Sequence, residues 1–287
     1  MTAPVPPTPP IPSTPPVPPT PPVPSTPPVP PTPPLTSALA GRTVLLAGGS
    51  SGIGLAAARL LTGLGARLVL IARDEARLRT AAASLGPGAA VTALCADIRD
   101  EDRLARILDT AGPVDHILVT AGTVTRAPLA EAGRETLRDC VEDRLQGAWA
   151  VARAAADRLT PGGSLTYLSG IQVARPRPGT AAMIAAAAGT EGLARALAVE
   201  LAPRRIRVNV LRPGTVDTPA MRRRLLAPGG PAAPGTDEDA AVAAAGRHLP
   251  LGRFGTADEV AAAALFLMAN PYVTGSVLTV DGGQSLL

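Results

Sequence analysis

Lysine is absent from this chain of 287 residues, and all 27 basic residues are arginine. Aromatic residues are also scarce, at 2% of the sequence. Proteins that bind single-stranded nucleic acid interleave basic with aromatic side chains, so this composition argues against a nucleic-acid partner. The net charge is only +4, and the pI lies near 10.0 because titration passes directly to arginine.

Long apolar runs and a secretion signal are missing as well. No window reaches about 18 uninterrupted apolar residues, and the N-terminus has no basic start followed by an apolar core. We therefore expect a cytoplasmic protein that does not bind a membrane. The two cysteines, Cys95 and Cys140, have no CxxC spacing and no histidine neighbours, which indicates reduced thiols and no metal site.

Proline is abundant, and 19 of its 33 occurrences lie in residues 1–34. Residues 5–34 form five six-residue repeats, and this density of proline favours polyproline II. We predict a Pro-rich polyproline II or disordered tail over 1–35 and one domain over 36–287. The tail is a ligand for a groove that binds polyproline II, a solvated spacer, or sequence upstream of the true start codon.

Beyond the tail, apolar runs alternate with helical patterns, which is typical of a doubly wound parallel sheet. Strands are predicted at 43–48, 67–72, 90–96, 115–120, 163–169, 206–212 and 276–281. Helices are predicted at 52–64, 74–85, 100–110, 131–159, 180–202 and 256–269. The fold class is therefore a three-layer α/β/α Rossmann-type domain with about seven strands. The stretch from Pro213 to Leu251 is expected to be a mobile segment over the site, and Arg222–Arg224 a solvated loop.

A glycine-rich turn follows the first apolar run. Gly48, Gly52 and Gly54 stand between the strand at 43–48 and the helix at 52–64, where backbone amides can approach a pyrophosphate. Arg73 ends the second strand, where it can pair with a 2′-phosphate, so NADP(H) is favoured over NAD(H). The alternative is that Arg73 is solvated and Asp74 only caps the next helix.

Several motifs agree in order and spacing with one family. They are Gly48–Gly54, Asp97-Ile98, Ala121-Gly122, Ile206–Asn209, Pro213–Thr218, Leu251–Gly255 and Asp281–Gly283. From about Gly41 to the C-terminus the chain resembles the short-chain dehydrogenase/reductase family. The resemblance, together with Arg73, assigns the cofactor contacts to Gly48, Ser50, Ser51, Gly52, Ile53, Gly54, Arg73, Asp97, Ile98, Ala121, Gly122, Pro213, Gly214, Val216 and Thr218.

The resemblance also implies four catalytic positions, and none of them carries the family's residue. In the family a Tyr moves the proton, a Lys binds ribose and lowers the pKa of that Tyr, a Ser orients the carbonyl, and an Asn supports a proton relay. The flanking sequence places Met183 at the Tyr, Ala187 at the Lys, Gly170 at the Ser and Arg144 at the Asn. Because the chain has no lysine, a shift of register cannot restore the Tyr-Lys pair.

Five side chains near these positions are candidate replacement donors: Ser169, Thr120, Gln172, Arg144 and Thr180. Arg144 is the foremost candidate, because a buried cation facing the nicotinamide could polarise a carbonyl or bind a carboxylate. Arg144 could instead lie on a helix surface, and the others could be purely structural.

Two functions remain open. The first is an atypical NADP(H)-dependent oxidoreductase of a small carbonyl or alcohol, with slow turnover or non-redox chemistry. The second is an inactive NADP(H)-binding subunit that pairs with an active relative. In the resembling family the helix at 180–202 commonly packs on a partner, which implies a homo-oligomer (dimer or tetramer) or a hetero-oligomer with an active relative.

Overall fold

The computed structural model describes residues 34–287, except 123–124, 228–229 and 234. The chain divides into two units, 1–31 and 32–287, and the description below concerns the second unit. The expectations for the Pro-rich tail, up to residue 33, lie outside the described residues.

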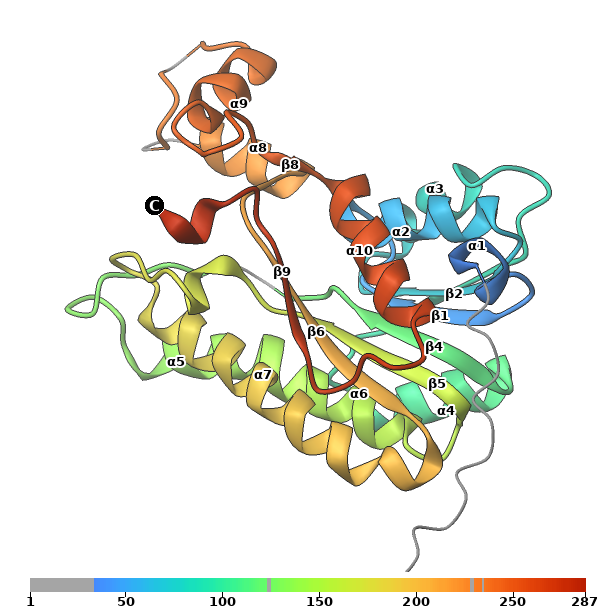
Figure 1. The fold of residues 1–287 in the computed structure, drawn as a ribbon. Coiled ribbons are helices and arrows are strands. Elements are labelled where there is room, and N and C mark those ends of the chain that lie inside the picture. The colour runs from blue at the N-terminus through green and yellow to red at the C-terminus, as the bar shows by residue number, and fades with distance from the viewer. Residues whose placement is uncertain (1–33, 123–124, 228–229, 234) are drawn as a thin grey trace, which may run out of the picture. The chain divides into compact units, whose positions relative to one another are not determined.

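Seven parallel strands form the central sheet in the order β3-β2-β1-β4-β5-β6-β9 (Figure 1). They are β1 (Thr43–Ala47), β2 (Arg67–Ala72), β3 (Val91–Cys95), β4 (Val114–Val119), β5 (Leu159–Leu168), β6 (Arg207–Pro213) and β9 (Val277–Val280). The predicted fold class is confirmed. Because the strand order reverses between β1 and β4, a crevice for a dinucleotide is expected where these two strands end.

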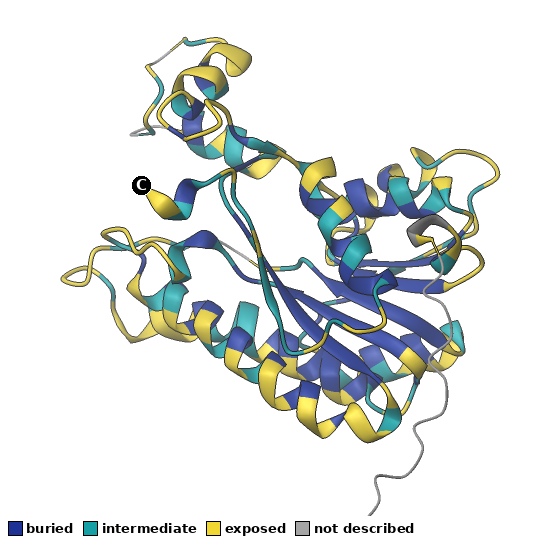
Figure 2. Cartoon of the chain, viewed as in Figure 1, coloured by how far each residue is buried: buried dark blue, intermediate teal, exposed yellow. Residues whose placement is uncertain are grey.

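Helices cover both faces of the sheet (Figure 1). One layer contains α2 (Gly52–Gly63), α3 (Glu75–Ala83) and α10 (Ala257–Ala269), and the other contains α4 (Glu101–Ala111), α6 (Gly147–Ala155) and α7 (Ala181–Glu200). Every residue of β1 is buried, with Leu45 and Ala47 in one apolar cluster and Val44 and Leu46 in the other (Figure 2). Successive side chains of this buried strand therefore point to opposite faces of the sheet and pack into two different apolar cores.

Side-chain caps begin several helices where the sequence predicts a start. The Asp74 carboxylate accepts from the backbone N–H of Arg77 at 2.9 Å, and the Asp100 carboxylate accepts from Arg103 at 2.8 Å. At α10 the Thr256 hydroxyl and the Glu259 carboxylate each accept from the other's backbone N–H. Each such cap satisfies a donor that the helix leaves free, which stabilises the helix by about 1 kcal/mol.

The predicted helix 131–159 is interrupted. It consists of α5 (Arg134–Cys140), a π-helical segment η1 (Val141–Gln146) and α6. Gly147 begins α6 and lies close to Ile98, which follows β3. An added Cβ on Gly147 would stand 2.7 Å from Ile98 Cδ1. π-Helical turns are frequent at functional sites, and this one carries Arg144.

The segment predicted to be mobile contains regular structure. It holds β7 (Val216–Asp217), which pairs with β8 (Gly255–Thr256), followed by α8 (Pro219–Leu226) and α9 (Glu238–Gly246). Leu225, Leu249 and Phe254 form a separate small apolar cluster there. Figure 1 shows α8 and α9 standing away from the sheet. The prediction that Arg222–Arg224 form a solvated loop is wrong, because these residues lie on α8.

The remaining short helices are α1 (Leu35–Ala38), η2 (Ile171–Val173), η3 (Ala202–Arg204) and η4 (Gln284–Leu286). By length and hydropathy α7 alone among the described helices could cross a membrane. Its Ala194, Leu197 and Ala198 belong to the core cluster beneath the sheet, as expected for the core helix of a globular domain. The hydropathy of α7 is therefore weak evidence for a membrane span.

Candidate functional site

The turn after β1 requires glycine at two places. Gly48 has φ +100°, and an added Cβ would lie 2.5 Å from Thr120 Oγ1 and 2.7 Å from the backbone N of Ala121. A Cβ on Gly54 would lie 2.3 Å from the carbonyl oxygen of Gly48. The missing side chains therefore let the start of α2 press against the end of β4.

The N-terminus of α2 is available to a phosphate group. The Ser51 side chain occupies the N-cap position but makes no capping hydrogen bond. The first N–H groups of a helix have no partner within the helix, and the positive end of the helix dipole at this terminus favours an anion. This arrangement fits the pyrophosphate of a dinucleotide.

A cavity of about 650 Å³, here called the cofactor cavity, extends from this turn across the ends of β2, β3 and β4. Of the predicted cofactor residues, those that line it are Gly48, Ser50, Ser51, Gly52, Ile53, Arg73, Asp97, Ile98, Ala121, Gly122 and Thr218. A second cavity of about 180 Å³, the inner cavity, is lined by Pro213, Gly214, Val216 and Thr218. The structure thus gathers at these two cavities every predicted cofactor residue except Gly54, whose place is in the turn.

Three arginines line the cofactor cavity at the ends of β2 and β3: Arg73, Arg77 and Arg99. Arg73 is exposed, and its Nη1 lies 4.0 Å from Asp143 Oδ1. Asp74 caps α3, as the alternative interpretation expected. The Asp74 carboxylate already accepts from Arg77 N. The end of β2 therefore presents arginine, rather than a free acid, to a bound nucleotide.

Asp97, assigned to the adenine, lies within an ion pair. Its carboxylate accepts from Arg99 Nη2 at 2.7 Å and from Arg99 Nε at 3.1 Å. These hydrogen bonds lower the pKa of Asp97, and it is ionised at neutral pH. An adenine amino group would have to share this carboxylate with Arg99.

All four positions that the resemblance assigns to catalysis line the inner cavity: Arg144, Gly170, Met183 and Ala187. Its walls also share Ile53, Thr120, Gly122, Leu168, Thr218, Met221 and Arg224 with the cofactor cavity. A dinucleotide in the larger cavity would therefore reach the smaller one with its nicotinamide end. Met183 and Ala187 give this space an apolar stretch of wall.

Arg144 enters the inner cavity from η1. Its Nη1 donates to the carbonyl oxygens of Leu168 at 3.3 Å and Ser169 at 3.4 Å, just past the end of β5. The guanidinium packs against Gly122, since a Cβ placed there would stand 3.5 Å from the guanidinium carbon, an ordinary contact distance. Burial lowers the pKa of Arg144, but a guanidinium stays charged at neutral pH. Arg144 is therefore a cation at the cavity wall rather than a helix-surface arginine.

Most of the other candidate donors have structural duties. The Ser169 hydroxyl donates to Glu191 Oε1 at 2.8 Å, and Glu191 is in turn bound by Arg212 at 2.6 and 2.9 Å. The Thr180 hydroxyl donates to the carbonyl oxygen of Arg177. Ser169, a substitute candidate from sequence, thus uses its proton inside the protein. The buried Ser169–Glu191–Arg212 chain was not anticipated, because its members are far apart in the sequence.

Thr120 and the tyrosine of β5 are occupied as well. Thr120 Oγ1 donates to the carbonyl oxygens of Ala47 and Gly48, at 3.3 and 3.2 Å. Tyr167 is fully buried, and its hydroxyl donates to the carbonyl of Ala148 at 3.0 Å. Burial raises its pKa far above the usual range. Arg144 and Gln172 are the candidates from sequence that keep donors toward the inner cavity.

Sequence reasoning placed the segment that contains α8 over the site, but it missed the helix and assigned none of the residues of α8 to the site. Met221, Arg223 and Arg224 line the cofactor cavity, and Met221 and Arg224 also line the inner one. The available signal was the cluster Arg222–Arg224 next to Thr218, whose hydroxyl accepts from Met221 N at 3.2 Å to begin this helix.

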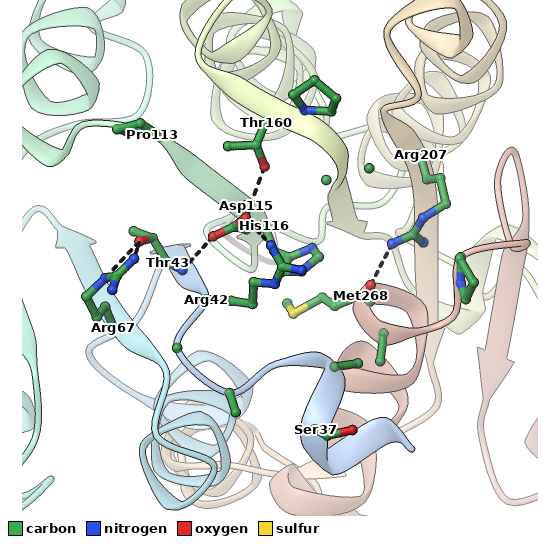
Figure 3. A pocket seen from close by; sticks show the side chains of 18 of the residues that line it. Ser37, Arg42, Thr43, Arg67, Pro113, Asp115, His116, Thr160, Arg207 and Met268 are labelled. Atoms are coloured by element: carbon green, nitrogen blue, oxygen red, sulfur yellow. Dashed lines mark hydrogen bonds and ion pairs between the residues drawn. The ribbon is translucent and has the colours of Figure 1, made fainter. Parts of the chain in front are cut away.

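A third cavity, of about 740 Å³, lies at the opposite ends of the strands and is here called the amino-end cavity (Figure 3). Its Asp115 carboxylate accepts from Arg42 Nη1 at 3.0 Å, Thr43 N at 2.9 Å and Thr160 Oγ1 at 3.0 Å. Figure 3 shows these groups converging between β1 and β4. The carboxylate's hydrogen bonds are thus all made within the protein.

Two more charged or titratable groups of this cavity hold the fold. Arg207 donates to the carbonyl oxygens of Leu267 and Met268 at the end of α10, although its Nε is buried without a partner (Figure 3). His116 Nδ1 lies 2.9 Å from Ser164 Oγ. Burial lowers the pKa of His116 to about 4, so the ring is neutral at neutral pH. The amino-end cavity is spacious, but these charged and titratable groups are bound within the protein, so it is not the candidate catalytic site.

Comparison with known proteins agrees with the geometry. The family model described as enoyl-(acyl carrier protein) reductase matches residues 47–285. Carbonyl reductase family member 4 of Danio rerio is 35% identical over 251 residues, which cover 86% of this chain and 99% of the relative.

Solved structures extend the similarity. A short-chain oxidoreductase of Pseudomonas aeruginosa PAO1, described as containing an atypical catalytic center, aligns with a TM-score of 0.79 at 31% identity over 86% of this chain and 97% of that one. The MalC reductase/Diels-Alderase of Malbranchea aurantiaca aligns with a TM-score of 0.78 at 31% identity over 88% and 100%.

Proposed function

The chain belongs to the short-chain dehydrogenase/reductase family of oxidoreductases, and from that premise we propose that it binds NADP(H) and reduces a small carbonyl compound, or oxidises the alcohol, through an atypical centre. One observation carries the proposal. The cofactor cavity shares wall residues with an inner cavity that is also lined by the cation Arg144 and the apolar side chains of Met183 and Ala187.

The choice of NADP(H) rests on the charges at the end of β2. Arg73 and Arg77 both line the cofactor cavity there, where a 2′-phosphate would lie. An acid that selects NAD(H) would accept from the ribose hydroxyls, but Asp74 is engaged as the N-cap of α3. Arginine pairs well with phosphate because several of its N–H groups can donate to one phosphate.

The nicotinamide supplies or accepts the hydride when it is bound. Arg144 donates hydrogen bonds to the substrate oxygen and stabilises the negative charge that develops there. The described side chains that line the inner cavity include no His, Asp, Glu or Cys, so none of them has an ordinary pKa near 7, and the Arg144 guanidinium holds its proton too tightly to donate it. Water then supplies the proton, and turnover is slow.

A second candidate function is an inactive NADP(H)-binding subunit. It is favoured by the absence of lysine from the whole chain and by alanine at 187, which can neither bind ribose nor shift a pKa. Both candidates predict cofactor binding, and they differ in turnover.

The assembly and location are also proposals. Apolar side chains on three neighbouring elements are partly or largely exposed: Leu137 on α5, Trp149 on α6 and Val199 on α7. We propose that this face binds a second copy or an active relative. Trp149→Glu should then lower the molar mass in light scattering, and an unchanged mass would count against this face. The free Cys95 and Cys140 agree with a cytoplasmic location.

The test titrates the full chain with NADPH and NADH, followed by fluorescence, and then measures consumption of NADPH with a panel of carbonyl compounds. We expect tighter binding of NADPH, weakened about 10-fold or more by Arg73→Gln, with little change for NADH. Arg79→Gln is the matched control, because Arg79 is an exposed arginine on the neighbouring helix α3 that pairs with Glu75.

Three outcomes separate the alternatives. Slow turnover that Arg144→Gln abolishes supports the oxidoreductase. Binding without turnover favours the inactive subunit, and failure to bind either nucleotide rejects both candidates.

A further inference from the structure

Three arginines from separate segments lie near enough to act on one another electrostatically, and one of them lines the inner cavity. Arg126 lies between β4 and α5, Arg177 lies in the turn before α7, and Arg224 lies on α8. Arg224 itself lines both the cofactor cavity and the inner cavity. We call these three residues the arginine rim.

Backbone contacts hold two of the segments together. The N–H of Ala127 donates to the carbonyl oxygen of Gly179 at 3.0 Å, and a Cβ on Gly179 would lie 3.5 Å from the carbonyl carbon of Ala127. Arg126 and Arg177 flank this contact. The rim is therefore assembled by tertiary structure and does not depend on one flexible loop.

Acidic partners are absent from the rim but present close by. In the described part of the chain, none of the three rim arginines forms an ion pair with a carboxylate. Arg222, two residues before Arg224 on α8, is bound by Asp217 and Asp239, each at 2.7 Å. The Arg224 side chain instead donates from Nη2 to Met221 Sδ at 2.9 Å. Acids are thus available on this side of the molecule, and they pair with Arg222.

The rim charges also repel one another. Burial lowers the pKa of Arg224, and the neighbouring charges of Arg126 and Arg177 lower it further. Arginine remains protonated at neutral pH, so the repulsion persists in the ligand-free protein. A bound anion would relieve it, which is a common reason for like charges to gather at a cavity.

Resting on the proposed function, we propose that the substrate is an anion, a compact carbonyl compound whose own carboxylate or phosphate group is held by the arginine rim while its carbonyl oxygen meets Arg144. The inner cavity, at about 180 Å³, suits a small molecule rather than a drug-sized ligand, which needs about 300–1,000 Å³. The rim binds the charge in the ground state and the transition state alike, so it sets substrate affinity, whereas Arg144 acts at the reacting oxygen.

The experiment uses the full chain and matched pairs of probes. Acetoacetate is compared with its neutral methyl ester, and dihydroxyacetone phosphate with neutral dihydroxyacetone, so that carboxylate and phosphate are tested separately. Binding is measured by calorimetry with and without NADPH. We expect the anion of at least one pair to bind about 10-fold or more tightly than its neutral partner, with affinity falling as salt rises.

Rim variants give the decisive comparison. Arg177→Gln and Arg224→Gln should each weaken the preferred anion about 10-fold, and where turnover is measurable they should raise KM more than they lower kcat. Arg175→Gln is the control, because Arg175 is an exposed arginine two residues from Arg177 that forms no ion pair in the described chain.

Failure of this inference can be told from failure of the proposed function. Equal binding of anions and neutral partners, no binding of either anion, or equal effects of Arg175→Gln and Arg177→Gln would overturn the anionic substrate. A protein that binds the anions through the rim but binds no NADPH would keep the rim as an anion site and reject the oxidoreductase.

Discussion

The two ends of the sheet carry arginines in opposite circumstances. At the amino-end cavity, Arg42 pairs with Asp115, Arg67 donates to Thr43 and Arg207 holds the end of α10. At the carboxyl ends of the strands, Arg144 and the arginine rim have no carboxylate partner among the described residues. The amino-end cavity, at about 740 Å³, is larger than the cofactor cavity or the inner cavity taken singly, yet Asp115, His116 and Arg207 in its wall are bound within the protein.

This difference indicates that the arginines at the amino end stabilise the fold, whereas those at the carboxyl end serve ligand binding. Groups that are satisfied inside the protein stabilise the fold, and removing one leaves its partner unsatisfied. Groups that lack partners cost stability and are free to bind a ligand. We therefore expect substitutions at the amino end to change unfolding and substitutions at the carboxyl end to change ligand binding or rate.

The largest expected effect is a gain of activity at the carboxyl end. Gly170→Ser, Met183→Tyr and Ala187→Lys together restore the proton-moving residues that the family resemblance assigns. A Cβ on Gly170 meets only Gln172 Oε1, at 3.2 Å, so serine can be accommodated. We expect kcat/KM for carbonyl reduction to rise about 10²- to 10⁴-fold, measured by loss of NADPH absorbance.

The matched control for the restored site replaces Tyr with Phe at 183, which keeps the ring and removes the acid. Equal rates for the Tyr and Phe versions would show that position 183 does not reach the reacting carbonyl, and would contradict the carry-over of these positions from the family.

A pH effect should come from the amino end. The folded protein protonates His116 only near pH 4, whereas an unfolded chain binds this proton near pH 6.5. The unfolded state thus holds more protons between these values, and the free energy of unfolding should fall by about 3 kcal/mol from pH 7 to pH 4. Urea unfolding across this range measures it.

Substituting each histidine in turn isolates the source of that slope. His116→Asn keeps a polar atom near Ser164 and should remove most of the histidine contribution, while His248→Asn, an exposed position, should leave it intact. An unchanged slope in His116→Asn would assign the pH dependence to carboxylates instead.

A smaller effect is expected from Arg207→Met. The carbonyl oxygens of Leu267 and Met268 at the end of α10 would lose their donors and the favourable cation. We expect a loss of about 2 kcal/mol in the free energy of unfolding with an unchanged Kd for NADPH. Arg79→Met, which breaks only an exposed ion pair with Glu75 on α3, should cost well under 1 kcal/mol. A weakened Kd in Arg207→Met would show that the two ends are coupled.

The smallest effect has the opposite sign. Removing two rim charges with Arg126→Gln and Arg177→Gln should raise the Tm of the ligand-free protein slightly, by about 1 °C, because like charges repel by a few tenths of a kcal/mol. Scanning calorimetry measures it. A clear fall in Tm would mean that the rim arginines stabilise the fold, as the arginines of the amino-end cavity do, and would contradict the distinction between the two ends.

Local patterns predicted much of this molecule. The alternation of apolar runs and helical stretches gave the strands and main helices within a few residues, except that β5 starts four residues earlier than predicted. The need for glycine at Gly48 and Gly54 was readable from their place between a strand and a helix. Arg73 and Asp74 were also placed correctly at the end of β2, with Asp74 as the cap of α3.

Other features depended on contacts between distant residues. The π-helical turn that carries Arg144 lies inside an otherwise helical pattern, and α8 was hidden in a segment rich in Pro, Gly and Arg. The sequence predicts Ser169 as a free donor, but in the structure its hydroxyl donates a hydrogen bond to Glu191, from the middle of α7. Local sequence periodicity does not predict a hydrogen-bond partner that lies 22 residues away in the chain.

The sequence by itself determined the doubly wound domain, the glycine turn for a dinucleotide and the lack of any lysine for the usual chemistry, because periodicity, glycine conformation and composition are local properties. The tertiary structure alone decided which arginines are paired. Arg126, Arg177 and Arg224 are separated by dozens of residues, and only the packing of three segments brings their charges together, with no ion pair to an acid among the residues that the structure describes.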